Sequence, residues 1–132
     1  MDKVNWRYAM QHISLYLAAA MTALWGVAHL FATKRVVAGF GEITPDNRRI
    51  ITMEWIVEGV ALISTATFVA AATLVQPEAA VSAAVYGVAI TTLVVLAVVS
   101  LFTGFRIAFL PFRLCPFIFG ASASLIAWGA WA

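Results

Sequence analysis

The sequence predicts an all-α integral membrane protein, an up-down four-helix bundle in a single domain over residues 1–132. Two observations lead to this prediction. Of the 132 residues, 64% are hydrophobic and only 11% are charged, whereas about a quarter of a soluble domain is charged. The apolar residues also fall into four stretches, each near the roughly 20 residues that a spanning helix needs. We therefore expect lipid around most of the surface.

The four stretches should be helices, because hydrocarbon offers no partner for a free backbone N–H or C=O. Their expected ranges are about 13–33, with a start as early as Trp6, then 50–75, 81–105 and 114–132. The first stretch is too long for the apolar core of a signal peptide, so we expect it to be retained. Short connections should make successive helices antiparallel neighbours.

Two helix starts have clear sequence signals. Thr44 is the expected N-cap of the second helix, Pro45 its first residue, and Asp46 a favourable charge at the positive end of its dipole. Pro111 and Pro116 are expected to bracket the start of the fourth helix. These signals predict where the two helices begin.

The basic residues predict the orientation. Both termini and the turn at 76–80 share one side, which carries Lys3 and Arg7. The other side holds the third loop and the first loop, expected at 36–43 as the longest connection. Excess positive charge marks the cytoplasmic side, so we expect both termini outside. Six basic residues define that cytoplasmic side: Lys34, Arg35, Arg48, Arg49, Arg106 and Arg113.

Three ionisable residues inside apolar stretches form the candidate site: His29, Glu54 and Glu58. Such groups are costly in a bilayer and are usually kept for function. At 1.5 Å per residue, His29 and Glu54 lie about 7–8 Å inside the cytoplasmic boundary, and Glu58 lies one turn deeper. The i,i+4 spacing places both glutamates on one helix face, which we expect to face the bundle interior. Two carboxylates this close in low dielectric do not both stay charged cheaply, so we expect Glu58 to be neutral.

The partner of the glutamates should come from another helix, because no arginine lies three or four residues from Glu54. Arg106 and His29 are the candidates. Aromatic residues of the same half are expected to line a pocket: Trp25, Phe31, Trp55, Phe102 and Phe105. The predicted site has Glu58, Glu54 and His29 as catalytic residues and Arg106, Trp25 and Trp55 as ligand-binding residues.

A purely structural role is the main alternative for these residues, since buried polar networks also fix helix register. Cys115 is expected to be a small buried apolar residue. His29, Glu54, Glu58 and Cys115 could supply one mononuclear metal site, but the Glu-x-x-His motif of di-iron bundles is absent. We therefore predict no metal site and leave the cofactor open.

Two segments resemble the DoxX-like small bacterial membrane proteins. One is Gly26-Val27-Ala28-His29-Leu30, and the other runs from Glu54 to Gly59 and continues as Val60-Ala61-Leu62. Arg35 and the stretch 41–49 depart from the family pattern. The resemblance implies a helical bundle with a link to quinone or redox systems, and it identifies no catalytic residue. The expected location is the inner membrane of a bacterium.

Three functions follow as hypotheses. In the first, the protein binds or acts on an amphiphilic small molecule (a quinone, an isoprenoid or a sterol-like lipid) by acid/base chemistry. In the second, it is a non-catalytic accessory subunit of a larger membrane complex. In the third, it is a dimeric proton-coupled transporter with Glu58 as the carrier. The net charge of +2 gives no basic stripe for nucleic acid. The expected partners are therefore the bilayer, a hydrophobic small molecule, and other membrane subunits or a second copy.

Overall fold

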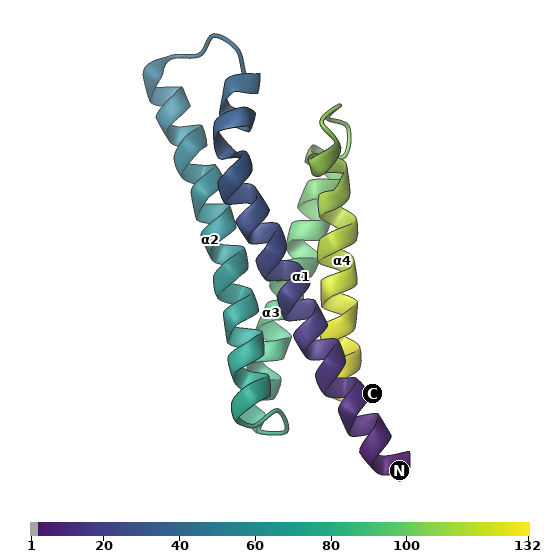
Figure 1. Ribbon diagram of the computed structural model, residues 1–132. Coiled ribbons are helices and arrows are strands. Elements are labelled where there is room, and N and C mark those ends of the chain that lie inside the picture. The colour runs from purple at the N-terminus through teal and green to yellow at the C-terminus, as the bar shows by residue number, and fades with distance from the viewer. Residues whose placement is uncertain (1–2) are drawn as a thin grey trace.

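The computed structural model describes residues 3–132, with side chains described from Trp6 onward. It contains four helices: α1 (Lys3–Gly39), α2 (Pro45–Val75), α3 (Ala80–Thr103) and α4 (Leu110–Trp131). They alternate in direction, so the start of α1, the α2–α3 turn and the end of α4 share one end (Figure 1). The predicted up-down four-helix bundle is confirmed. All four helices are long and apolar enough to cross a membrane.

The connection between α1 and α2 is shorter than predicted. Val36 and Val37 are buried and helical, so α1 continues through them to Gly39. The expected loop at 36–43 is therefore wrong over its first half. Gly41 has φ of 69°, a conformation that costs glycine little and other residues more.

The start of α2 matches its sequence signals. The backbone N–H of Asn47 donates to the Thr44 hydroxyl at 3.2 Å, which satisfies one of the free N–H groups of the first turn. Pro45 opens the helix, and Asp46 pairs with Arg49 at 3.3 Å. This cap sets where α2 begins, and hence the register of Glu58 along it.

The fourth helix begins at Leu110, four residues before its predicted start. Pro111 lies in its first turn, where no N–H is needed. Pro116 lies inside the helix, so the prediction that it marks the helix entry is wrong. An interior proline is tolerated in a membrane bundle because neighbouring groups can satisfy the carbonyl that it frees.

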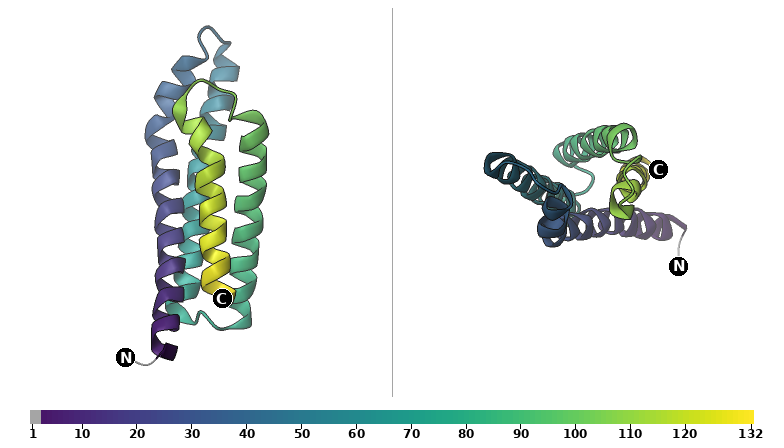
Figure 2. Two further views of the ribbon diagram at one scale, coloured as in Figure 1. Left: turned by 90° about the vertical axis from the view of Figure 1, so that its right-hand side faces the viewer. Right: turned by 90° about the horizontal axis from the view of Figure 1, so that it is seen from above.

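The four helices form two hairpins, α1–α2 and α3–α4. The hairpins join mainly along α1 and α4, and the contact between α2 and α3 is smaller. Figures 1 and 2 show the hairpins diverging toward the end that carries the α1–α2 and α3–α4 connections. The buried core lies deeper, around Leu15, Leu93, Phe119 and Ile126. Two cavities open at the diverging end.

Polar bonds close the opposite end. The Thr73 and Tyr86 hydroxyls lie 3.0 Å apart, both buried, and join α2 to α3. The Ser82 hydroxyl donates to the Gln76 carbonyl at 2.7 Å, which satisfies a free carbonyl at the end of α2. α2 and α3 are therefore tied beside their connecting turn and free to separate farther along.

The helices differ in length. α1 has 37 residues and α2 has 31, against 24 in α3 and 22 in α4. Since about 20 residues cross the hydrocarbon, the first hairpin extends past the α3–α4 turn at the diverging end (Figure 1). The α3–α4 turn thus marks the expected membrane boundary there.

Candidate functional site

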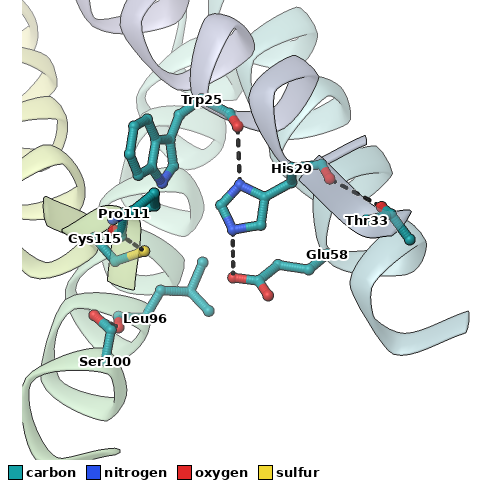
Figure 3. A network of polar contacts seen from close by, with 8 residues as sticks. All are labelled: Trp25, His29, Thr33, Glu58, Leu96, Ser100, Pro111 and Cys115. Carbon is teal, nitrogen blue, oxygen red and sulfur yellow. Dashed lines mark hydrogen bonds and ion pairs between the residues drawn. The ribbon is translucent and has the colours of Figure 1, made fainter. Parts of the chain in front are cut away.

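His29 and Glu58 form an ion pair between α1 and α2. The Nε2 atom of His29 lies 3.5 Å from Oε1 of Glu58 (Figure 3). The His29 side chain is 5% exposed and that of Glu58 is 34% exposed. The pair therefore joins a buried imidazole to a carboxylate on the edge of the helix interface.

Two glycines allow this approach. A Cβ on Gly26 would lie 2.7 Å from the Gly59 carbonyl oxygen, and one on Gly59 would lie 2.9 Å from the Gly26 carbonyl oxygen. Backbones of α1 and α2 are thus in direct contact, as small residues permit in membrane helices. His29 follows Gly26 by less than one turn, and Glu58 directly precedes Gly59. The helix crossing therefore sets the distance between the two ionisable groups.

The second nitrogen of His29 fixes the tautomer. Nδ1 lies 2.9 Å from the Trp25 carbonyl oxygen. A carbonyl only accepts, so Nδ1 must carry hydrogen and donate. Nε2 is then the ring nitrogen that faces Glu58, at 3.5 Å from Oε1.

Aromatic rings hold the imidazole in place. Trp55 stacks on His29 with ring centroids 4.9 Å apart and planes at 30°. Trp25 meets it edge-on at 5.8 Å. Phe112 of α4 contacts Trp55 at 5.3 Å. These contacts leave His29 little freedom to turn away from Glu58, and they bring the predicted ligand-binding residues Trp25 and Trp55 beside it.

A cavity of about 200 Å³ lies between the hairpins and includes the pair in its wall. Figure 3 shows the Glu58 carboxylate on the side of Leu96 and Ser100 of α3. The wall is mostly apolar, from α3 and α4. It is formed by His29, Trp55, Glu58, Leu96, Val99, Ser100, Thr103, Gly104, Ile107, Phe112, Cys115 and Phe119.

The other polar groups in the wall are already committed. The Ser100 hydroxyl donates to the Leu96 carbonyl at 2.7 Å, and the Thr103 hydroxyl donates to the Val99 carbonyl at 2.7 Å. The Cys115 thiol lies 3.5 Å from the Pro111 carbonyl oxygen. As expected, Cys115 is buried. A molecule in the cavity would therefore find its hydrogen-bond partner mainly at Glu58.

Trp55 provides one further polar group. Its indole Nε1 is buried and has no hydrogen-bond partner among the described residues. A buried unpaired N–H is unfavourable by about 1–3 kcal/mol.

Glu54 is not part of this site. It is exposed, and among the described residues it forms no ion pair. The prediction that both glutamates face the interior is thus wrong for Glu54. Trp55 and Gly59 face α1. Each glutamate directly precedes one of these residues in the sequence and therefore lies at the edge of the face that contacts α1. Glu58 meets His29 across the glycine contact, whereas Glu54 lies one turn nearer the diverging end.

Arg106 is also outside the site. It is exposed in the α3–α4 turn and does not line the cavity, so the alternative that it pairs with Glu58 is not observed. Of the five aromatic residues predicted to line the pocket, only Trp55 does, so the prediction is wrong for Trp25, Phe31, Phe102 and Phe105. Phe31 is 86% exposed and Phe102 is 74% exposed. Phe112 and Phe119 line the cavity instead. No local signal separates these phenylalanines, because each lies in an apolar run and only the packing decides which faces inward.

Metal binding finds no support in the residues that the structure describes, where no three His, Cys, Asp or Glu side chains group closely enough to hold an ion. Comparison of the chain with protein-family models, with curated proteins and with solved structures finds no match. The resemblance to DoxX-like proteins therefore stays a prediction, and functional inference depends on the site itself.

Proposed function

We propose that this protein binds an amphiphilic small molecule in the cavity between its hairpins and exchanges a proton with its headgroup through Glu58. One observation carries the proposal: His29 and Glu58, two ionisable groups whose Nε2 and Oε1 atoms lie 3.5 Å apart, lie in the wall of a mostly apolar cavity. Hydrophobic walls with one or two convergent polar groups are typical of small-molecule sites. A group that can donate or accept one proton is suited to acid/base chemistry.

The site favours a ligand that enters from the bilayer. The cavity opens where the two hairpins diverge, between helices whose outer faces are apolar. A headgroup with a carbonyl or hydroxyl oxygen could contact Glu58, and its apolar tail could extend into lipid. Quinones, isoprenoid alcohols and sterol-like lipids share this design. In this proposal His29 holds the proton that Glu58 exchanges, and Trp25 and Trp55 orient the imidazole.

Substitution of Glu58 tests the proposal. The probes are a short-chain benzoquinone, an isoprenoid alcohol and a sterol, each added to the protein in mild detergent. A ligand that binds only the folded state raises the thermal midpoint, so at least one probe should raise that of the wild type. Glu58→Gln keeps the shape but cannot exchange the proton, and we expect about tenfold weaker binding, which equals about 1.4 kcal/mol.

Glu54→Gln is the matched control, because it makes the same change one turn away on the same helix, outside the cavity. It should bind the probe as the wild type does. Equal binding by Glu58→Gln and the wild type would show that proton exchange at Glu58 does not contribute to binding. Failure of all three probes to shift the wild type would refute the proposed ligand class.

Two alternative functions remain predictions from the sequence. In an accessory subunit of a larger membrane complex, the pair would only hold α1 against α2. In a dimeric proton-coupled transporter, Glu58 would be the carrier and a second copy would be needed to complete the path. Neither explains why Glu58 is turned toward a cavity in a single copy. Particle mass in mild detergent separates them, since co-purified chains favour the first and a stable dimer favours the second.

The proposed topology places the diverging end in the cytoplasm. Six basic residues lie toward that end, and the opposite end carries Lys3 and Arg7. In intact bacterial cells, a membrane-impermeant thiol reagent should label Glu78→Cys in the α2–α3 turn and leave Gly39→Cys unlabelled. Native Cys115 is buried, so the unsubstituted protein gives the background. Labelling of Gly39→Cys alone would reverse the orientation.

A further inference from the structure

A second cavity lies at the diverging end, beyond the one that contains Glu58. Its volume is about 400 Å³, and it lies between the last turns of α1 and the α3–α4 turn. Aromatic and aliphatic side chains form most of its wall. The lining residues are Arg35, Val36, Gly39, Phe40, Ile107, Phe109 and Phe112.

Arg35 is the one charged residue in this lining. Its guanidinium carbon lies 5.9 Å from the centroid of the Phe109 ring, a distance at which cation and ring attract. The ion pairs found among the described side chains are His29–Glu58 and Asp46–Arg49, so no carboxylate neutralises Arg35 there. The guanidinium is positioned by a ring, and its N–H groups remain free for an anion.

The surroundings reinforce the positive charge. Lys34 and Arg106 are exposed near the same end. Arg113 is exposed as well, and its Nε–H donates to the Ile107 carbonyl at 2.9 Å, which helps to hold the turn that forms the cavity wall. Asp46 at this end pairs with Arg49. Glu42, also at this end, is exposed, does not line the cavity and forms no ion pair among the described side chains. An anion would therefore approach Arg35 favourably.

Depth identifies the kind of anion. Arg35 contacts Phe109 in the α3–α4 turn, where two of the four spanning helices end. Because about 20 residues cross the hydrocarbon, the expected membrane boundary, with its lipid phosphates, lies at this turn. The neighbouring wall is apolar, as the glycerol and upper acyl chains of a lipid require.

We propose that this cavity binds an anionic phospholipid of the adjacent leaflet, with its phosphate at Arg35 and its upper chain against Phe40, Phe109 and Phe112. The positive charges of this end, on Lys34, Arg35, Arg106 and Arg113, repel a choline group. The site therefore prefers phosphatidylglycerol to phosphatidylcholine. This inference does not rest on the proposed function of Glu58. The cavities share Ile107 and Phe112, but the two ligands differ in charge and in depth.

The experiment measures lipid retention by native mass spectrometry of the full chain in mild detergent. Phosphatidylglycerol and phosphatidylcholine with identical chains are titrated separately. The wild type should retain phosphatidylglycerol several-fold better. Arg35→Gln should lower that retention about fivefold, as expected for loss of one cation near the lipid surface. Arg35→Lys keeps the charge without the planar fork and should retain an intermediate amount.

Arg106→Gln is the matched control, because it removes the same charge from the same end but not from the cavity wall. Its loss of phosphatidylglycerol retention should be clearly smaller than that of Arg35→Gln, because Arg106 adds only to the general positive charge of this end and does not line the cavity. An equal loss in Arg106→Gln and Arg35→Gln would mean general surface attraction and would overturn the site, as would wild-type retention by Arg35→Gln. Full competition by millimolar inorganic phosphate would overturn the lipid assignment in favour of a free anion. The thermal-midpoint assay with Glu58→Gln tests only the cavity that contains Glu58, so the two proposals can fail independently.

Discussion

Gly26→Ala should destabilise the protein by about 1–3 kcal/mol, the usual range for atoms forced into a packed contact. The new Cβ would lie 2.7 Å from the Gly59 carbonyl oxygen and 2.9 Å from Cγ1 of Ile63. The first of these is a backbone atom, so α1 and α2 must move apart. That movement would lengthen the 3.5 Å separation of His29 and Glu58 and weaken binding at Glu58 as well.

Gly87→Ala is the matched control. Gly87 lies in helix α3, and a Cβ there would meet no other atom within 4 Å. Alanine favours helix over glycine by about 1 kcal/mol, so this variant should be as stable as the wild type or more stable. The measurement is the unfolding midpoint in a denaturing-detergent titration. If the two alanine variants unfold alike, the direct backbone contact between α1 and α2 does not exist in the membrane protein.

Much of the fold was predictable because lipid imposes simple rules. Segment length, the absence of charge and the Thr44–Pro45 start specify four helices and their order. The helix ends were harder to predict. The helix continues through Val36 and Val37 because they are buried by other segments, and a sequence window does not contain that information. Pro116 lies within a helix although proline usually marks a helix start or end, because a membrane bundle tolerates interior prolines.

The site was predictable in part. The cost of an ionisable group in an apolar segment singled out His29 and Glu58, and the structure places these two side chains together, whereas their role in function stays a prediction. The same argument wrongly included Glu54. The i,i+4 spacing places both glutamates on one helix face, but it does not show which of them contacts a neighbouring helix. Arg106 was excluded by the three-dimensional path of the α3–α4 turn, which leaves it exposed. Gly26 and Gly59, which set the α1–α2 distance, lie in the two segments that resemble DoxX-like proteins. Their contact could not be predicted from either segment alone, because it forms only when α1 and α2 pack together.

The coupling between His29 and Glu58 is the most direct test of the pair. His29→Leu leaves Glu58 without its partner, and Glu58→Leu leaves Nε2 of His29 without one. Glu58→Leu leaves the buried imidazole unpaired and should cost about 1–3 kcal/mol. His29→Leu leaves a carboxylate that is 34% exposed, so it should cost less. His29→Leu with Glu58→Leu removes both groups, so the double variant should cost clearly less than the sum of the single changes. The expected coupling is on the order of 1 kcal/mol.

A second cycle with Glu54→Leu provides the control. Glu54 lies on the same helix but does not contact His29, and changes without shared partners should add. Unfolding free energies come from the same denaturing-detergent titration for all variants. Additive costs in the His29–Glu58 cycle would show that the 3.5 Å pair contributes nothing to folding. The proposed proton exchange would then lose its basis, because a pair that shares a proton must be coupled.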